Sequence, residues 1–309
     1  MKISEKLELI SRRIGLTQTE LARRFNVSFT TLNSWINNRS TPRAKKRAAI
    51  EELYLEVTGQ KVIPEEILTR RKWEIRQKSL IYKNIVNEIL RNPDIRDQFI
   101  LKLTYHSNNI EGSTLTELDT AAILFDNIAL PNKSLVEQLE AKNHQTALNY
   151  VFEYVEKSNE IDENFILKMH SILMNGIQPD AGAYRNHAVR IIGVNLPTAN
   201  YASITKLIPN VIKLINNKKK DVIKTTAEVH SEIERIHPFS DGNGRIGRLL
   251  MQAMLLKNNF APAIIHQKNK QLYYTYLYKA QTKKDYGQLE NFLCDSIIDG
   301  FKILERKDI

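Results

Sequence analysis

The sequence predicts a mostly helical protein with two domains, and three observations support this prediction. Glycine and proline, the strongest helix breakers, are scarce, with 11 and 9 among 309 residues. Apolar residues recur at steps of three and four through much of the chain, which is the period of an amphipathic helix. The length suits one small domain and one of ordinary size. We therefore expect an all-α fold.

The composition narrows the class of protein further. Hydrophobic residues make up 42% of the chain, enough for a sizeable core. The single cysteine, Cys294, excludes an internal disulfide or a cysteine metal cluster. Because the sequence has no long uncharged apolar run and no signal-like start, we expect a cytoplasmic protein without a membrane partner.

The positive charge is concentrated near the N-terminus. Residues 1–80 hold 17 Lys+Arg and 9 Asp+Glu, a net charge of +8, whereas the whole chain carries +10. The rest of the chain therefore contributes only +2. Such a distribution indicates an anionic partner for the N-terminal quarter, and a merely solvated basic face explains it equally well.

The first elements follow from the stretch LTQTELARRFNVSFTTLNSWINNRSTPR, which begins at Leu16. Thr17 and Glu20 have the spacing of a capping box and predict the start of a helix. Ser28 is a suitable cap for a second helix, in which Leu32 and Trp35 face the core. Two short helices joined by a tight turn are typical of a helix-turn-helix.

This stretch resembles the repressor-type helix-turn-helix family in Gln18, in Leu21-Ala22 and in the turn 26–28, which reads Asn-Val-Ser. The resemblance implies that residues 1–60 are a DNA-binding domain with duplex DNA as partner. A module that serves only dimerisation or partner contact is the alternative, and a homodimer is compatible with either. The expected DNA-contacting residues are Ser28, Thr30, Thr31, Asn33 and Arg39.

A linker is predicted at residues 61–74, where a proline and a basic run follow the glycine at position 59. A helical domain over residues 75–309 follows, with a helix break at Asn92-Pro93.

The segment HPFSDGNGRIGR, residues 237–248, lies between two predicted helices. Gly242 and Gly244 leave backbone N–H groups open to a ligand, and the start of the second helix favours an anion. Arg245 and Arg248 share one face of its first turn, where cations oppose the helix dipole unless an anion is bound. The pattern predicts a polyphosphate site.

Three more side chains of this segment suit the same chemistry. Asp241 offers a carboxylate for Mg²⁺, which binds carboxylate and phosphate oxygens together. Asn243 offers an amide donor. His237 is placed to take a proton from an incoming hydroxyl, although a histidine here could also simply cap the preceding helix.

The segment matches every fixed position of the motif of the Fic family, which it therefore resembles closely. The resemblance implies a helical Fic fold and transfer of AMP from ATP to a serine, threonine or tyrosine hydroxyl of a protein. His237 is then the general base, and Asp241 holds Mg²⁺. The implied phosphate-binding residues are Gly242, Asn243, Gly244, Arg245 and Arg248. The kinase-like branch carries lysine at position 244, so glycine favours AMP transfer.

Two further parts of the nucleotide site follow only from the resemblance. GAYRNHAVRIIGVNLP, residues 182–197, resembles the family's small β-hairpin flap, which pairs with the target; a purely structural hairpin is the alternative. The flap residues expected to border ATP are Ile192, Gly193, Val194 and Asn195. Those expected near adenine are Tyr274, Leu277 and Gln281, in a stretch that is otherwise an ordinary helix core. The family often has asparagine in place of Gln281.

The segment YHSNNIEGS, residues 105–113, ends a predicted helix with Gly112 as its C-terminal cap. Glu111 then lies in the last turn, where a negative charge is unfavourable and a cation should compensate. The segment resembles the Fic inhibitory motif in Ser107, Glu111 and Gly112. The resemblance implies that Glu111 pairs with Arg248 and inhibits the enzyme.

The sequence thus favours a self-inhibited protein adenylyltransferase with a DNA-binding module. One alternative is a nucleotide-sensing transcription regulator, against which the complete catalytic segment argues. Another is a Fic enzyme that transfers a different phosphate-containing group. The sequence does not identify the target protein, which could be the chain itself.

Overall fold

The structure, a computed structural model, describes residues 1–190, 196–217 and 221–306. The chain folds into two compact units. The first comprises Met1–Pro64 together with Lys268–Leu289, and the second comprises Glu65–Gln267 together with Glu290–Ile309. Both units are helical, as the sequence predicted.

The first unit contains the predicted helix-turn-helix. Its helices are α1 (Ile3–Ile14), α2 (Gln18–Arg24), α3 (Phe29–Ile36), α4 (Ala44–Val57) and α14 (Lys270–Lys283). The capping box is present before α2, since the Thr17 amide donates to Glu20 and the Glu20 amide to Thr17. Ser28 caps α3 by accepting from the Thr31 amide at 3.1 Å. Both predicted helix starts are confirmed.

A distant segment completes this unit. Helix α14 packs against α1 and α4, although more than 200 residues separate it from them in sequence. The Tyr276 hydroxyl lies 3.4 Å from Glu56, and a Cβ placed on Gly59 would lie 3.2 Å from Thr275. The sequence did not predict this packing, because the apolar face of a helix does not specify its partner.

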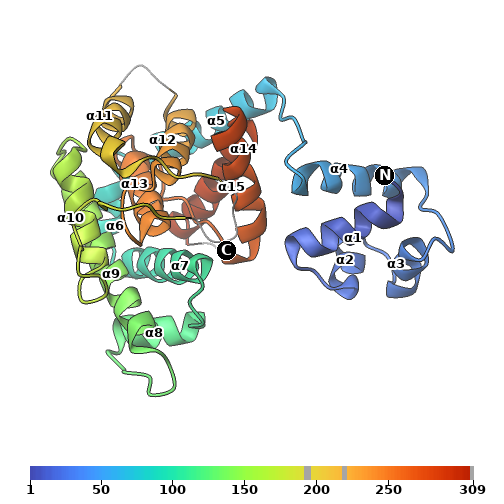
Figure 1. The fold of residues 1–309 in the computed structure, drawn as a ribbon, viewed down its shortest axis with the longest axis horizontal. Helices are drawn as coiled ribbons and strands as arrows, with labels where there is room; N and C mark the ends of the chain where they lie inside the picture. The colour runs from blue at the N-terminus through green and yellow to red at the C-terminus, as the bar shows by residue number, and fades with distance from the viewer. Residues whose placement is uncertain (191–195, 218–220, 307–309) are drawn as a thin grey trace. The chain divides into compact units, whose positions relative to one another are not determined.

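The second unit is arranged around α13 (Asn243–Lys257), which packs against α7, α9, α10 and α12 (Figure 1). The surrounding helices are α5 (Glu65–Leu80), α6 (Ile85–Arg91), α7 (Pro93–Glu111), α8 (Glu117–Phe125), α9 (Leu135–Glu156), α10 (Glu163–Leu173), α11 (Ile204–Ile215) and α12 (Val222–Ile236). Helix α15 (Gly287–Leu304) belongs to this unit from Glu290 onward. The central position of α13 explains why nearly all of its residues are buried.

Two predicted helix ends are confirmed. α6 ends at Arg91, and α7 begins with Pro93 in its first turn, where proline costs no hydrogen bond. Gly112 caps α7 in the left-handed region, with φ 111°. The predicted linker is helical from Glu65 onward, because α5 begins there, and the domain boundaries otherwise stay a prediction.

The predicted hairpin lies only partly within the described residues. Arg190 and Pro197 form one antiparallel bridge. Ile192, Gly193, Val194 and Asn195, expected to border the nucleotide, lie outside the residues that the structure describes.

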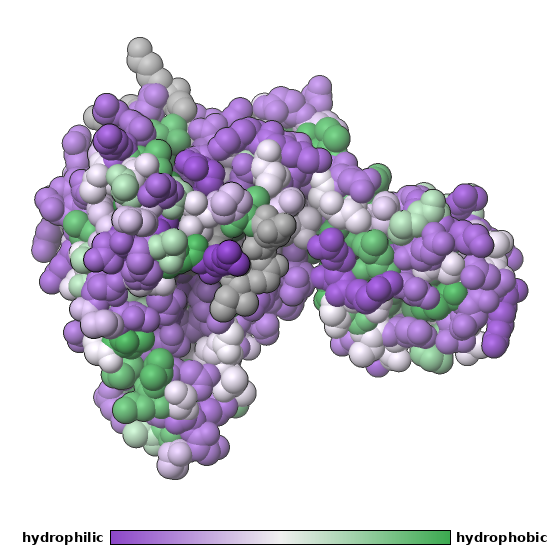
Figure 2. Space-filling model, viewed as in Figure 1, coloured by the Kyte–Doolittle hydropathy of each residue, from purple (hydrophilic) through white to green (hydrophobic). Residues whose placement is uncertain are grey.

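Hydrophilic side chains cover most of the face shown in Figure 2, and apolar ones gather over α8 and the segment after it. The exposed apolar residues there are Leu118, Phe125, Ile128, Leu135 and Val136. Among the described residues, no helix is both long enough and apolar enough to cross a membrane. The predicted homodimer stays a prediction.

Candidate functional site

The predicted catalytic segment forms a loop between the end of α12 and the start of α13. His237 is the C-terminal cap of α12, and its amide donates to the Ile233 carbonyl at 2.8 Å. Its backbone is left-handed, with φ 52°, which is uncommon for a residue other than glycine. This conformation turns the chain out of the helix just before Pro238.

The His237 ring is oriented by its own helix. Its Nδ1 lies 3.3 Å from the Glu234 carbonyl, and since a carbonyl only accepts, Nδ1 carries the proton. Nε2 then keeps its lone pair. Burial lowers the pKa of His237; the Glu234 carbonyl opposes this shift, and the Arg185 charge adds to it. The imidazole is therefore a neutral proton acceptor at neutral pH.

The conformation of the loop depends on Gly242 and on hydrogen bonds of the Asn243 side chain. Gly242 is left-handed, with φ 77°, and a Cβ there would lie 2.8 Å from the Met174 sulfur. The Asn243 side chain accepts from the Phe239 amide and donates to the Phe239 carbonyl, both at 2.9 Å. Asn243 thus shapes the loop, and its contact with a phosphate stays a prediction.

Arg245 is buried in the first turn of α13 and paired with a glutamate from α9. Its Nη1 donates to Glu140 at 2.5 Å, and its Nη2 lies 3.5 Å from Asp241. The Asp241 side chain is 51% exposed and accepts from the Gly242 amide at 2.6 Å. In the described part of the chain, no group of three or more His, Cys, Asp or Glu side chains is arranged to hold a metal.

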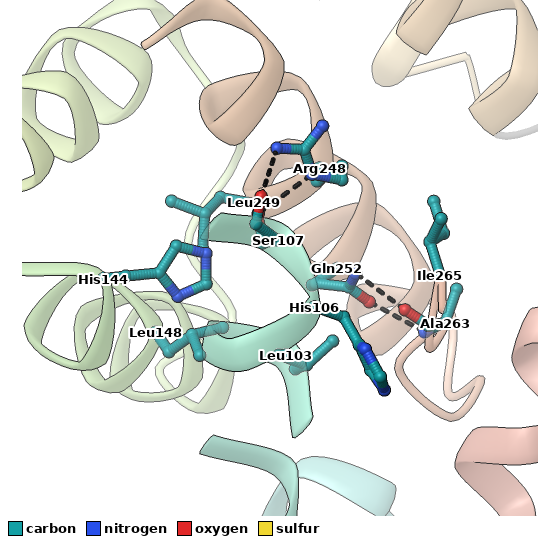
Figure 3. A pocket seen from close by; sticks show the side chains of 10 residues that line it. All are labelled: Leu103, His106, Ser107, His144, Leu148, Arg248, Leu249, Gln252, Ala263 and Ile265. Carbon is teal, nitrogen blue, oxygen red and sulfur yellow. Dashed lines mark hydrogen bonds between the residues drawn. The ribbon is translucent and has the colours of Figure 1, made fainter. Parts of the chain in front are cut away.

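Arg248 is held by the end of α7. Its Nε donates to the Ser107 hydroxyl at 2.9 Å, and its Nη2 donates to the Ser107 carbonyl at 3.1 Å (Figure 3). Nη2 also donates to Glu111 Oε1 at 2.6 Å, so the predicted ion pair is present. The cation that the last turn of α7 requires is therefore Arg248.

Glu111 also lies on the backbone of the predicted phosphate site. A Cβ placed on Gly244 would lie 2.3 Å from Glu111 Oε1 and 3.2 Å from Arg248 Nη1. The carboxylate therefore covers the first turn of α13 at the position where the sequence predicted an anion.

The groups buried behind this turn respond to its charges. Burial raises the pKa of Glu234 to about 7; the Glu111 charge raises it further, and Arg248 opposes the shift. Burial and the Arg248 charge lower the pKa of His144 and of His230 to about 3. These two histidines are therefore neutral at physiological pH.

A cavity of about 20 Å³ lies between α7, α9 and α13, next to Ser107, His144 and Arg248 (Figure 3). A space of this size holds one water molecule. It is much too small for a nucleotide.

Three charged residues of the site were not found from the sequence. Glu140 and Glu234 sit in long helical stretches with many other charged residues, and nothing local distinguishes them. Arg185, which is 3% exposed, binds the His237 carbonyl at 2.7 Å. The only feature of the sequence that pointed to Arg185 was its position in the predicted flap segment.

The residues expected near adenine, Tyr274, Leu277 and Gln281, lie on α14 in the first unit. The catalytic loop lies in the second unit. Their role in nucleotide binding stays a prediction from the resemblance.

The residues expected to contact DNA lie on and beside α3. Ser28 and Thr31 hydrogen-bond to each other in the N-terminal cap, and the Asn33 amide donates to Gln18 at 3.2 Å. Thr30 and Arg39 are exposed. Ser28 is exposed as well, whereas Thr31 and Asn33 are half-buried, and DNA binding stays a prediction.

Comparison with known proteins agrees with this geometry. Residues 160–255 match the Fic/DOC family, and residues 9–54 match a helix-turn-helix family. A protein adenylyltransferase Fic from Nematostella vectensis is 34% identical over 194 residues, which is 61% of this chain and 44% of that protein. One from Aedes aegypti is 32% identical over 62% of this chain and 39% of that protein. The chain spans less than half of these relatives.

Solved structures show the same fold. A Fic-domain-containing signaling protein from Bacteroides thetaiotaomicron has a TM-score of 0.66 at 22% identity, covering 77% of this chain and 99% of that chain. Fic-1 from C. elegans has a TM-score of 0.67 at 20% identity, covering 93% and 84%. The helical fold predicted from the sequence is therefore confirmed.

Proposed function

We propose that this chain, whose residues 160–255 form a Fic/DOC family domain, is a protein adenylyltransferase that its own Glu111 holds inactive. The observation that carries the proposal is His237, a neutral base, in the loop that leads into α13, whose first turn carries two buried arginines. A proton acceptor next to an anion site is what attack of a hydroxyl on a nucleotide requires. The names of the curated relatives support AMP as the transferred group.

In the proposed reaction the oxygen of a protein hydroxyl attacks the α-phosphorus of ATP. The bond from this phosphorus to the oxygen that bridges to the β-phosphate breaks, and pyrophosphate leaves. The hydroxyl proton passes to Nε2 of His237, which the hydrogen bond of Nδ1 to Glu234 leaves free to accept it. The substrate hydroxyl belongs to a serine, threonine or tyrosine of a target protein.

The first turn of α13 would hold the phosphates. The Gly244 amide lies at the positive end of the helix dipole, the Gly242 amide would join it once it leaves the Asp241 carboxylate, and Arg245 and Arg248 add two charges. The exposed Asp241 carboxylate fits Mg²⁺ that arrives with ATP, because this ion binds few protein carboxylates together with phosphate oxygens. Such an ion would neutralise phosphate charge.

The proposed self-inhibition rests on the position of Glu111 at the predicted phosphate site. Its carboxylate pairs with Arg248 at 2.6 Å and lies against Gly244. A terminal phosphate would lose the arginine, meet a negative charge and find the backbone covered. ATP that binds elsewhere in the loop would present its α-phosphate out of line with the hydroxyl, and misplacement of this kind costs about 10²-fold in rate.

Labelled ATP tests the reaction. Glu111→Gly should label protein from α-labelled ATP and not from γ-labelled ATP, and only with Mg²⁺ present. His237→Ala in the same background should lose about 10²–10⁴-fold, the usual worth of a general base. Label from the γ position would indicate a kinase. No protein label with either nucleotide would favour the nucleotide-sensing regulator.

The first unit supports a second function, binding of duplex DNA. The match to a helix-turn-helix family over residues 9–54 favours it, as does the charge of +8 in residues 1–80. Thr30 and Arg39 are exposed at α3 and just after it, where a recognition helix meets a groove. Contact with another protein through this unit is the alternative, and the measurement that separates them is given in the Discussion.

A further inference from the structure

Arg185 is buried, and among the described residues its guanidinium donates to backbone carbonyls alone. Nε donates to His237 at 2.7 Å, and Nη2 donates to Ile236 at 3.3 Å and to Ala199 at 2.6 Å. Nη1 donates to His187 at 2.6 Å. Within the described residues no carboxylate pairs with it.

A buried charge without a counter-ion is unfavourable unless fixed dipoles replace it. Here the dipoles are those of α12, since the Ile236 and His237 carbonyls lie at its negative C-terminal end. Arg185 therefore acts as the charged cap of the helix that carries the catalytic histidine. The rigid fork of arginine suits this task, because several donors must reach separate acceptors at once.

We propose that Arg185 is a positioning residue for His237. Arg185 fixes the left-handed backbone of the histidine and joins it to the carbonyls of residues 187 and 199. Its effect on catalysis rests on the proposed function; the contacts themselves do not. A left-handed conformation outside glycine persists only where its surroundings determine it strongly. The guanidinium supplies that constraint through the His237 carbonyl, and the Arg185 amide adds a bond to the Pro238 carbonyl at 3.0 Å.

The charge of Arg185 has a second effect on the same histidine. Burial is the largest cause of the lowered pKa of His237, and the Arg185 charge lowers it further. The Glu234 carbonyl and the charges of Glu111 and Asp241 act in the opposite direction. Removing the Arg185 charge should therefore raise the pKa of His237, whereas a lysine at 185 should keep it low.

Two substitutions separate geometry from charge. In the Glu111→Gly background, Arg185→Lys keeps the charge and loses the fork, and Arg185→Gln loses both. We expect labelling from α-labelled ATP to fall about tenfold or more with lysine, since small misplacements are costly. With glutamine we expect the same fall and an acid limb of the pH profile that moves to higher pH. Arg235→Gln is the matched control, because Arg235 lies on α12 and pairs with Glu232.

A second measurement does not depend on activity. The His237 ring is titrated by NMR in the full chain and assigned by its loss in His237→Ala. Arg185→Gln should raise its midpoint, and Arg185→Lys and Arg235→Gln should not. An unchanged midpoint in Arg185→Gln together with unchanged labelling in both Arg185 variants would overturn the proposal. So would unfolding of both, which would assign Arg185 to the fold as a whole. Absence of labelling in Glu111→Gly itself would instead count against the proposed function.

Discussion

At the scale of single residues, the site balances two buried arginines with three glutamates. Glu140 pairs with Arg245, and Glu111 pairs with Arg248. Glu234 is buried, and its Oε1 has no hydrogen-bond partner among the described residues. Its carboxyl can stay protonated while Glu111 supplies the charge, and it can ionise when Glu111 leaves.

This arrangement predicts how stability depends on pH. Burial first, and Glu111 second, raise the pKa of Glu234 from 4.5 to about 7. The folded protein therefore binds the Glu234 proton more tightly than the unfolded chain, and this contribution to stability is lost as pH rises from 4.5 to 7. The Glu234→Gln variant has no such proton to lose. Its unfolding free energy minus that of wild type should therefore increase as pH rises from 4.5 to 7, by up to roughly 3 kcal/mol. Urea denaturation at several pH values measures it, and a difference that does not change with pH would contradict the assignment.

The pKa of His237 predicts the acid limb of activity. Burial holds this pKa below its ordinary value of 6.5, and loss of the Glu111 charge lowers it further. Labelling by Glu111→Gly should stay constant from neutral pH down to below 6.5 and then fall as the imidazole takes a proton. Initial rates of labelling across pH 4.5–8 measure the profile. A midpoint above 6.5 would exclude His237 as the group that titrates.

The sequence could predict the residues of the loop but not their supporting contacts. His237, the glycines and the arginines are adjacent in the chain, so their chemistry was visible in one motif. Glu140 reaches Arg245 from a helix more than 100 residues away, and Arg185 acts through carbonyls. Such contacts depend on tertiary packing, which the local pattern does not contain.

At the scale of elements, single residues at helix termini predicted the helix ends best. Thr17, Ser28, Pro93 and Gly112 each act where the sequence placed them, because caps satisfy groups of the same helix. The packing of α14 against α1 and α4 was not predicted, since it joins helices that are distant in the chain.

The helix-turn-helix element predicts a salt-dependent interaction with DNA. The full chain should bind duplex DNA with an affinity that falls steeply as salt rises, because phosphate contacts release counterions. Arg39→Ala should weaken binding to all sequences and reduce the salt slope by about one unit. Thr30→Ala should instead change sequence preference. Fluorescence anisotropy at several salt concentrations measures both, and no binding at low salt would favour protein contact through this unit.

At the scale of the whole molecule, the chain has one unit with a match to a helix-turn-helix family over residues 9–54 and one with a match to the Fic/DOC family over residues 160–255. The second unit carries Glu111 at the end of α7, before the loop 237–248 in sequence and in contact with Arg248 and Gly244 in space. In the self-inhibition that we propose, the restraining contact therefore lies within one unit of the chain. The same proposal requires Glu111 to leave Arg248 and Gly244 before the enzyme is active.

One measurement tests this account most directly: labelling of protein from α-labelled ATP by wild type, Glu111→Gly, Arg248→Ala and the double variant in parallel. We predict little label with wild type and about 10²-fold more with Glu111→Gly, which frees the arginine and the backbone of Gly244. Arg248→Ala and the double variant should both stay inactive, because the phosphate partner is gone. Glu111→Gln, which keeps the shape and loses the charge, should fall between wild type and Glu111→Gly. Equal or lower labelling by Glu111→Gly than by wild type would contradict the account and leave Glu111 as a structural partner of Arg248.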